Sequence, residues 1–456
     1  MKIAQWTAVL VLAAMVGGIT FVMVYLGGSR PTEVKPPPLD GLTFVAKRYP
    51  EEGAKAITTE VGKTGQQDFW FQNETGRTVA VGLNAKSCKC TNIELTIAPE
   101  SWRPYLIAEA AARMLQRAPQ TLPDCAVSVA TFQHDQVFRP RPESEARTFA
   151  LTQEESAEVP PGAVGWVRLT WRGERAEPRF LNADLWMNQR TGSINAVLEV
   201  GTMISEPMIV SREVNVEPFN IGELRNGKTI NIVCYSVTRP AFQVKAERGN
   251  DNIKPQSDPI EIGQPVPLTS DRLRRLEGTK ERHMLRLHCG YRIPIHLQAK
   301  APDGTPFEIG HFRRSVKLTS PDEGIEPVEV EVTGLVLGDV RVGGPKEGGA
   351  VLLGPFPSRR GAKGDITLQS DRPDLELTLD TTRVPSFLKA SLEGPEKSLG
   401  GHRMWVLRVE VPPSAAQGEF PRLEDPVFRD SAIYVKTNEK PARSIRIPVR
   451  GVANEG

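Results

Sequence analysis

The sequence predicts an all-β protein, and three observations support this prediction. Apolar and polar residues alternate with period two in short stretches such as 167–171 and 405–411, as in strands that bury one face. Glycine and proline, at 39 and 38 residues, divide the chain into short segments. Helical patterns between these segments are almost absent, which disfavours parallel sheets with crossover helices. We therefore expect antiparallel sheets stacked as immunoglobulin-like β-sandwiches.

Length and composition indicate several globular domains without a nucleic-acid partner. The chain has 456 residues, which suggests about three domains of ~150 residues each. Hydrophobic residues make up 39% and charged residues 25%, as in folded proteins. The net charge is only +2 and aromatic residues are 6%, so neither a basic face nor a base-stacking surface is expected.

The N-terminal segment from Trp6 to Gly28 contains no charged residue. At the helical rise it would span roughly 34 Å, enough to cross a hydrocarbon core of about 30 Å. Trp6 and Tyr25 lie near its two ends, where amphipathic rings favour the membrane interface. We expect an uncleaved, single-pass transmembrane helix at 6–28. The alternative is a cleaved signal peptide, although its apolar region is usually only about 7–15 residues long.

The flanks of this helix predict its orientation. Lys2 and the α-amino group favour a cytoplasmic tip at 1–5, which places the bulk of the chain in the periplasm or another extracytoplasmic space. A linker at 29–40 follows, with three successive prolines from Pro36 to Pro38. Such a run favours an extended conformation and acts as a semi-rigid spacer.

A repeat predicts the domain boundaries. Three alternating strands end in Gly201, Gly334 and Gly451. These glycines are 133 and 117 residues apart, which suits one sandwich of about 100 residues plus insertions. We expect immunoglobulin-like domains at 41–205, 206–338 and 339–456. The first should carry a helical insertion at about 100–118, capped by Ser101.

The segment from Phe69 to Thr91 resembles a bacterial envelope family of unknown function with ASPM/SPD/Hydin-like (ASH-like) immunoglobulin-like domains. The matching residues are Phe69, Phe71, Asn73, Gly76, Val79, Val81, Leu83 and the motif Ser87-Cys88-Lys89-Cys90-Thr91. Lys89 departs from the small residue usual between the cysteines, and a long insertion precedes the turn Pro160-Pro161-Gly162. The third domain is similar without cysteines. The resemblance implies a fold and an envelope location and no established chemistry.

Cys234 and Cys289 both alternate in phase with apolar residues, so their thiols should face inward. Their separation is compatible with a disulfide between the two sheets of a sandwich, which an oxidising envelope would favour. The alternative is a pair of buried free thiols that behave as small hydrophobic side chains.

Cys88-Lys89-Cys90 allows three interpretations. Two thiolates this close could bind a soft metal such as copper or zinc, with Cys125 as a third ligand. One of the two could instead form a disulfide with Cys125. In the third interpretation, both cysteines are structural thiols at the end of a strand.

Motifs for catalysis are missing from the sequence, since it has neither a nucleophile elbow nor a phosphate-binding Walker loop. We therefore expect a non-enzymatic protein without a cofactor, apart from copper or zinc at the cysteine motif. The expected function is that of a membrane-anchored extracytoplasmic scaffold that binds another envelope protein, for example by strand addition. The alternative is an envelope metal-binding protein that uses Cys88 and Cys90.

Overall fold

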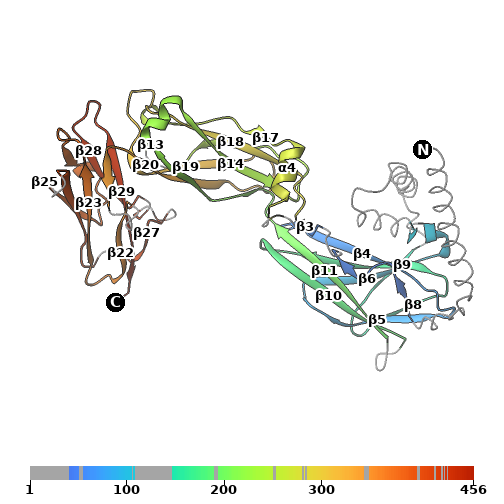
Figure 1. The fold of residues 1–456 in the computed structure, drawn as a ribbon. Helices are drawn as coiled ribbons and strands as arrows, with labels where there is room; N and C mark the ends of the chain where they lie inside the picture. The colour runs from blue at the N-terminus through green and yellow to red at the C-terminus, as the bar shows by residue number, and fades with distance from the viewer. Residues whose placement is uncertain are drawn as a thin grey trace, which may run out of the picture. The chain divides into compact units, whose positions relative to one another are not determined.

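A computed structural model describes most of the chain (Figure 1). The described residues are 41–50, 55–104, 106–107, 146–188, 194–249, 253–279, 282, 285–343, 349–397, 401–414, 417–422, 425, 427–428 and 430–455. Their structure is mostly β-sheet, which confirms the all-β prediction. The transmembrane helix expected from Trp6 to Gly28 and the linker expected at 29–40 lie outside the described residues. Within the described part, no helix has both the length and the apolar character needed to cross a bilayer.

The chain divides into two compact units. Unit 1 comprises the described residues of Met1–Ala54, Thr64–Arg172 and Arg179–Thr202. Unit 2 comprises the described residues of Lys55–Lys63, Gly173–Pro178 and Met203–Gly456. Unit 2 therefore contains both of the domains expected at 206–338 and 339–456, together with two short segments expected in the first domain.

Unit 1 is built from two sheets. The strands of sheet A are, in order, β1 (Thr43–Phe44), β4 (Thr64–Gln72), β9 (Val164–Arg172), β6 (Thr91–Ala98) and β7 (Arg147–Ala150). Those of sheet B are β2 (Arg48–Tyr49), β11 (Ile194–Ser205), β10 (Glu177–Met187), β5 (Val79–Lys86) and β8 (Ser156–Val159), with β3 (Ile57–Glu60) paired with β11 beside this order. Alternate residues of β8, β10 and β11 are buried, as expected when each sheet covers one face of the other, whereas β4 and β9 also bury Trp70 and Trp166 on their other face. The largest fully buried side chains include Phe69, Phe71, Leu169, Trp171 and Leu185.

The first sandwich of unit 2 has a single core shared by two sheets. One sheet contains β12 (Ile209–Val210), β14 (Lys228–Ser236), β18 (Cys289–Leu297), β16 (Ile260–Ile262) and β17 (Val266–Pro267). The other contains β13 (Glu213–Asn220), β20 (Val328–Leu337), β19 (Ile309–Thr319) and β15 (Lys245–Arg248). Ile232 and Ile293 of the first sheet pack in the same cluster as Phe312 and Val332 of the second. A helix, α4 (Ser270–Glu277), begins after Thr269, whose side chain accepts a hydrogen bond from the Arg272 N–H.

The second core of unit 2 also joins two layers. Its outer sheet contains β21 (Val340–Val342), β23 (Ala362–Ser370), β26 (Arg403–Val411) and β25 (Lys389–Lys397). The facing strands are β22 (Val351–Pro357), β24 (Leu377–Leu379), β27 (Gly418–Phe420), β28 (Ala432–Thr437) and β29 (Ser444–Asn454). Trp405 and Leu407 of β26 pack in one cluster with Ile445 and Ile447 of β29. A short parallel pairing of β19 with β29 connects the strands of the two cores.

The three strands that suggested a repeat share one structural role. β11, β20 and β29 each pair in parallel with an early strand of their own sandwich, namely β2, β13 and β22. Gly334 and Gly451 face the core, where a Cβ atom would lie 2.4 Å from the Phe312 ring and 2.8 Å from the Phe420 ring. These glycines therefore make room for an aromatic ring on the paired strand. Gly201 differs, because the ring beside it belongs to Phe180, which is 81% exposed.

The insertion in unit 1 begins as a 3₁₀ helix, η1 (Glu100–Trp102). Its N-cap is Pro99 and not the expected Ser101, which lies within the first turn. Trp102 is buried and stacks on Trp166 of β9 with ring centroids 5.9 Å apart, and Trp166 in turn contacts Trp70 of β4. The start of the insertion therefore covers the outer face of sheet A. The rest of the helix expected up to residue 118 lies outside the described residues, apart from 103–104 and 106–107.

The segment 55–63 is part of unit 2, and its strand β3 pairs with β11. Two of its side chains also bind residues of unit 2. The Thr58 hydroxyl donates to the Val237 carbonyl at 2.7 Å. Arg239 forms two hydrogen bonds with the carboxylate of Glu60, from Nε at 2.8 Å and from Nη2 at 2.6 Å. This two-point pairing is a geometry that arginine favours. Sequence patterning gives no signal for contacts between residues so far apart in the chain.

This ion pair predicts a pH-dependent contribution to stability. The Arg239 guanidinium holds the pKa of Glu60 below its ordinary value of 4.5, against the opposing effect of burial. Because the folded pKa is lowered, the stabilisation is complete above pH 4.5 and is lost as the pH falls through the folded pKa. We expect Glu60→Gln to lower the free energy of unfolding by about 1–3 kcal/mol at neutral pH, with the difference from wild type shrinking in acid. Urea unfolding at a series of pH values measures this difference, and a gap that persists undiminished at pH 3 would contradict the assignment.

Candidate functional site

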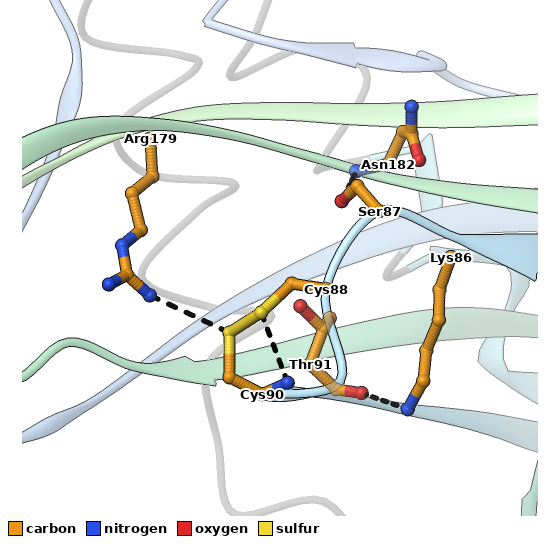
Figure 2. The surroundings of a disulfide bond; sticks show 7 residues. All are labelled: Lys86, Ser87, Cys88, Cys90, Thr91, Arg179 and Asn182. Carbon is orange, nitrogen blue, oxygen red and sulfur yellow. Dashed lines mark hydrogen bonds between the residues drawn. A yellow bond between two sulfur atoms is a disulfide. The ribbon is translucent and has the colours of Figure 1, made fainter.

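The motif Ser87-Cys88-Lys89-Cys90 forms the turn between β5 and β6, where the chain passes from sheet B to sheet A (Figure 2). Ser87 holds the start of the turn against β10, because its Oγ accepts the Asn182 N–H at 2.8 Å and its own N–H donates to the Asn182 carbonyl at 3.2 Å. The Thr91 N–H donates to the Cys88 carbonyl at 3.2 Å and closes the turn. Backbone and hydroxyl groups thus fix the loop on both sides of the cysteines.

Cys88 and Cys90 are joined by a disulfide (Figure 2). The turn brings their Cα atoms to 5.2 Å, a separation that a disulfide spans readily. The Cys90 N–H donates to the Cys88 sulfur at 3.1 Å, and Nη1 of Arg179 approaches the Cys90 sulfur at 3.6 Å. Lys86 lies on the other side of the turn, where its ammonium group donates to the Thr91 carbonyl at 2.6 Å.

The surroundings of the disulfide are exposed and positively charged. Cys90 is exposed and Cys88 is half-buried. Lys86, Lys89 and Arg179 place three cationic groups on or beside the turn. Cationic groups of this kind stabilise a thiolate relative to a thiol.

The disulfide differs from each of the three interpretations of the motif. The predicted bridge led from Cys88 or Cys90 to Cys125, whereas the structure joins the two neighbours to each other. The predicted metal site needs thiolate ligands, and sulfur atoms bonded to each other provide none. Among the residues that the structure describes, no three His, Cys, Asp or Glu side chains are grouped to hold a metal. Cys125 lies outside the described residues, so copper or zinc binding by the reduced motif stays a prediction.

Cys234 and Cys289 are free thiols, so of the two alternatives the disulfide between facing sheets is not formed and the pair of free thiols is. They lie on neighbouring strands of one sheet, where the register pairs Cys234 with Tyr291 and Cys289 with Ser236. The expectation that Cys234 faces inward holds, since it is fully buried. Burial raises the pKa of the Cys234 thiol to about 12 and also raises the pKa of Cys289. Both groups are therefore poor nucleophiles in the folded protein.

A second motif noted in the sequence acquires a structural explanation. Asn73 is 0% exposed and joins two turns of unit 1. Its Nδ2 donates to the carbonyls of Arg77 at 2.8 Å, Val159 at 2.9 Å and Pro160 at 3.0 Å. Its Oδ1 accepts the backbone N–H and the hydroxyl of Thr75 at 3.0 and 2.8 Å. One amide side chain thus connects the turn after β4 to the Pro160-Pro161-Gly162 turn.

Comparisons with known proteins provide no family assignment. No protein-family model matches the chain, and no curated protein matches it. Solved structures show only weak likeness. The ASH/PapD-like domain (PapD-like domain 7) of human CEP192 is 12% identical with a TM-score of 0.20, over 38% of this chain and 93% of that one. Zebrafish RET cadherin-like domains 1 to 4 are 10% identical with a TM-score of 0.19, over 67% of this chain and 62% of that one.

Titin Ig tandem domains are 11% identical with a TM-score of 0.17, over 54% of this chain and 97% of the titin fragment. Likeness at this level decides nothing about the chain. Strand pairing, and the buried residues that the paired sheets share, are what identify the individual β-sandwiches.

Proposed function

We propose that the chain is a membrane-tethered, extracytoplasmic scaffold that binds another envelope protein. In this binding mode, a strand of the partner protein is added to the edge of sheet A. The proposed role is non-catalytic. The membrane tether comes from the apolar segment at 6–28, and the envelope location comes from its flanking charges and from the family resemblance. The binding mode is supported by the exposure of the edge strand β7 and by the direction of its backbone N–H groups.

β7 has the features of an edge that can accept another strand. Among the described strands it pairs only with β6, and all four of its residues are exposed. The Leu151 N–H donates to the Ile93 carbonyl in line with the β6–β7 register, so the N–H groups of Phe149 and Arg147 also point toward β6. The N–H groups of Thr148 and Ala150 consequently point away from β6. Two outward donors on an exposed strand are what strand addition requires.

A longer edge strand, β25, is less suitable. Its pairing with β26 is interrupted by a bulge between Glu393 and Glu396, and Pro395 within it has no N–H to donate. Lys389 and Lys397 place charges at its two ends. Bulges, prolines and lysines are the features by which natural sheets block further strand pairing. We therefore place the binding edge at β7.

Ala150→Pro tests this placement. Proline removes one outward N–H and places its ring where an added strand would lie, while the hydrogen bonds toward β6 remain. A photo-crosslinking amino acid at Arg147, in the full chain in its native membrane, should give a discrete protein adduct. We expect Ala150→Pro to reduce this adduct at least tenfold, while changing the free energy of unfolding by less than about 1 kcal/mol.

Phe149→Pro is the matched control, because the N–H that it removes points toward β6. It should destabilise unit 1 by about 1–3 kcal/mol through the lost ladder bond. An adduct that survives Ala150→Pro at the wild-type yield would exclude strand addition at β7. The absence of any adduct from wild type would contradict the scaffold role at this edge.

A further inference from the structure

The Cys88–Cys90 disulfide closes one of the shortest loops that a disulfide can close, with a sequence separation of 2. A disulfide stabilises a fold mainly by restricting the unfolded chain, and this effect grows with the length of the closed loop. The turn is also held independently by the hydrogen bonds of Ser87 with Asn182 and of Thr91 with Cys88. The bond therefore contributes little to holding unit 1 together, and stability does not explain it.

The surroundings of the bond instead favour exchange with other thiols. Cys90 is exposed on the turn, so an incoming thiolate can reach its sulfur. Arg179, which lies 3.6 Å from that sulfur, attracts an anionic nucleophile. The Cys90 N–H, at 3.1 Å from the Cys88 sulfur, stabilises negative charge on the group that would leave (Figure 2). Exposure, attraction of the nucleophile and a stabilised leaving group are the requirements of thiol–disulfide exchange.

We propose that Cys88–Cys90 is a thiol–disulfide exchange site that accepts two electrons from a dithiol, either a small molecule or a cysteine pair of another protein. A thiolate of the dithiol attacks the Cys90 sulfur, the Cys88–Cys90 bond breaks, and its electron pair leaves on Cys88. The second thiol of the reductant, once deprotonated, attacks the mixed disulfide and releases Cys90 as a thiolate. The reductant becomes a disulfide, and the two cysteines gain two electrons and two protons.

The other described cysteines do not compete for this reaction. Cys234 is buried in the core of unit 2, and Cys289 is half-buried beside it, with its thiol donating to the Arg239 carbonyl at 3.2 Å. Exchange at the turn is also independent of the proposed strand addition, because β7 contributes no group to the disulfide and the cysteines contribute none to β7. The two proposals can therefore fail separately.

The test is a reduction series on the purified full chain, with dithiothreitol as the dithiol. Free thiols are blocked with a maleimide at each concentration and mapped by mass spectrometry, while tryptophan fluorescence reports unfolding. We expect Cys88 and Cys90 to become labelled together under conditions in which the fluorescence is unchanged and Cys234 stays unlabelled. A bond that persists until the protein unfolds would overturn the proposal, as would a native bridge from either cysteine to Cys125.

Arg179→Gln separates an exchange site from an exposed but passive disulfide. Loss of the cation should slow reduction about three- to tenfold, because the thiolate nucleophile is no longer attracted. Arg179→Lys should restore part of the rate, and Arg175→Gln, an equal change of charge on an exposed side chain, should leave it unchanged. An Arg179→Gln rate equal to wild type would refute the positioning role of Arg179.

Discussion

Asn73→Ala is expected to lower the free energy of unfolding of unit 1 by about 3–5 kcal/mol. In wild type the side-chain amide of Asn73 is fully buried. It donates to three carbonyls and accepts hydrogen bonds from the N–H and the hydroxyl of Thr75. Alanine leaves the buried Val159 carbonyl without this donor, and it leaves the Pro160 carbonyl with only the Ala163 N–H. Each buried polar group left unpaired costs about 1–3 kcal/mol, so the losses accumulate.

Urea unfolding followed by tryptophan fluorescence measures this loss, because Trp70, Trp166 and Trp171 all lie in unit 1. Asn84→Ala is the matched control. Asn84 is exposed and makes one side-chain hydrogen bond, to Asp184 at 2.8 Å, so its loss should cost less than about 1 kcal/mol. If Asn73→Ala and Asn84→Ala lowered the free energy of unfolding equally little, the Asn73 side chain would not be what holds the two turns together.

Arg314→Met is expected to destabilise unit 2 by about 3–5 kcal/mol. Arg314 is 6% exposed, and its guanidinium donates to Asp258 at 3.0 Å and to Glu308 at 2.8 Å. Burial alone would lower the pKa of Arg314, but the carboxylates of Glu308 and Asp258 outweigh this effect and raise it. The group is therefore a fixed buried cation. Methionine has a similar volume but no charge, and it would leave Glu308 without its ion-pair partner and Asp258 with only Arg248.

Arg274→Met serves as the control for this prediction, since Arg274 and its partner Asp271 are both about three-quarters exposed. Exposed ion pairs of this kind contribute little, and no clear change in stability is expected. The double variant Arg314→Met/Glu308→Leu should recover part of the loss, because it removes the carboxylate that has lost its ion-pair partner. Equal stability of Arg314→Met and Arg274→Met would show that the buried cluster is not held by its cation.

Period-two alternation predicted the sheets because each strand buries one face. The same signal predicted that Cys234 points inward, and the structure agrees. Alternation cannot tell which strands are neighbours, however, since it fixes the face of a residue and not its partner strand. For this reason the sequence left a disulfide and two free thiols both open for Cys234 and Cys289, which are free and lie on neighbouring strands of one sheet. The spacing of Cys88 and Cys90 likewise left their pairing open.

Contacts between distant turns carry no periodic signal at all. The sequence offered Asn73 and Pro160-Pro161-Gly162 as separate features, and only the fold shows that the first binds the second. Glu60 was expected in the first domain, but it lies in unit 2, where it pairs with Arg239. The glycine repeat was informative where the glycine faces the core, at Gly334 and Gly451. At Gly201 the strand has the same parallel pairing, but the glycine lies beside an exposed ring.

Amide hydrogen exchange of β7 tests the proposed binding mode most directly. The Thr148 and Ala150 N–H groups point away from β6, so they should exchange readily in the purified chain. In the chain purified together with its crosslinked partner, both amides should exchange at least tenfold more slowly, while the Ser87–Thr91 turn keeps its rate. Unchanged exchange at both positions, in a chain that carries its partner, would contradict strand addition to sheet A.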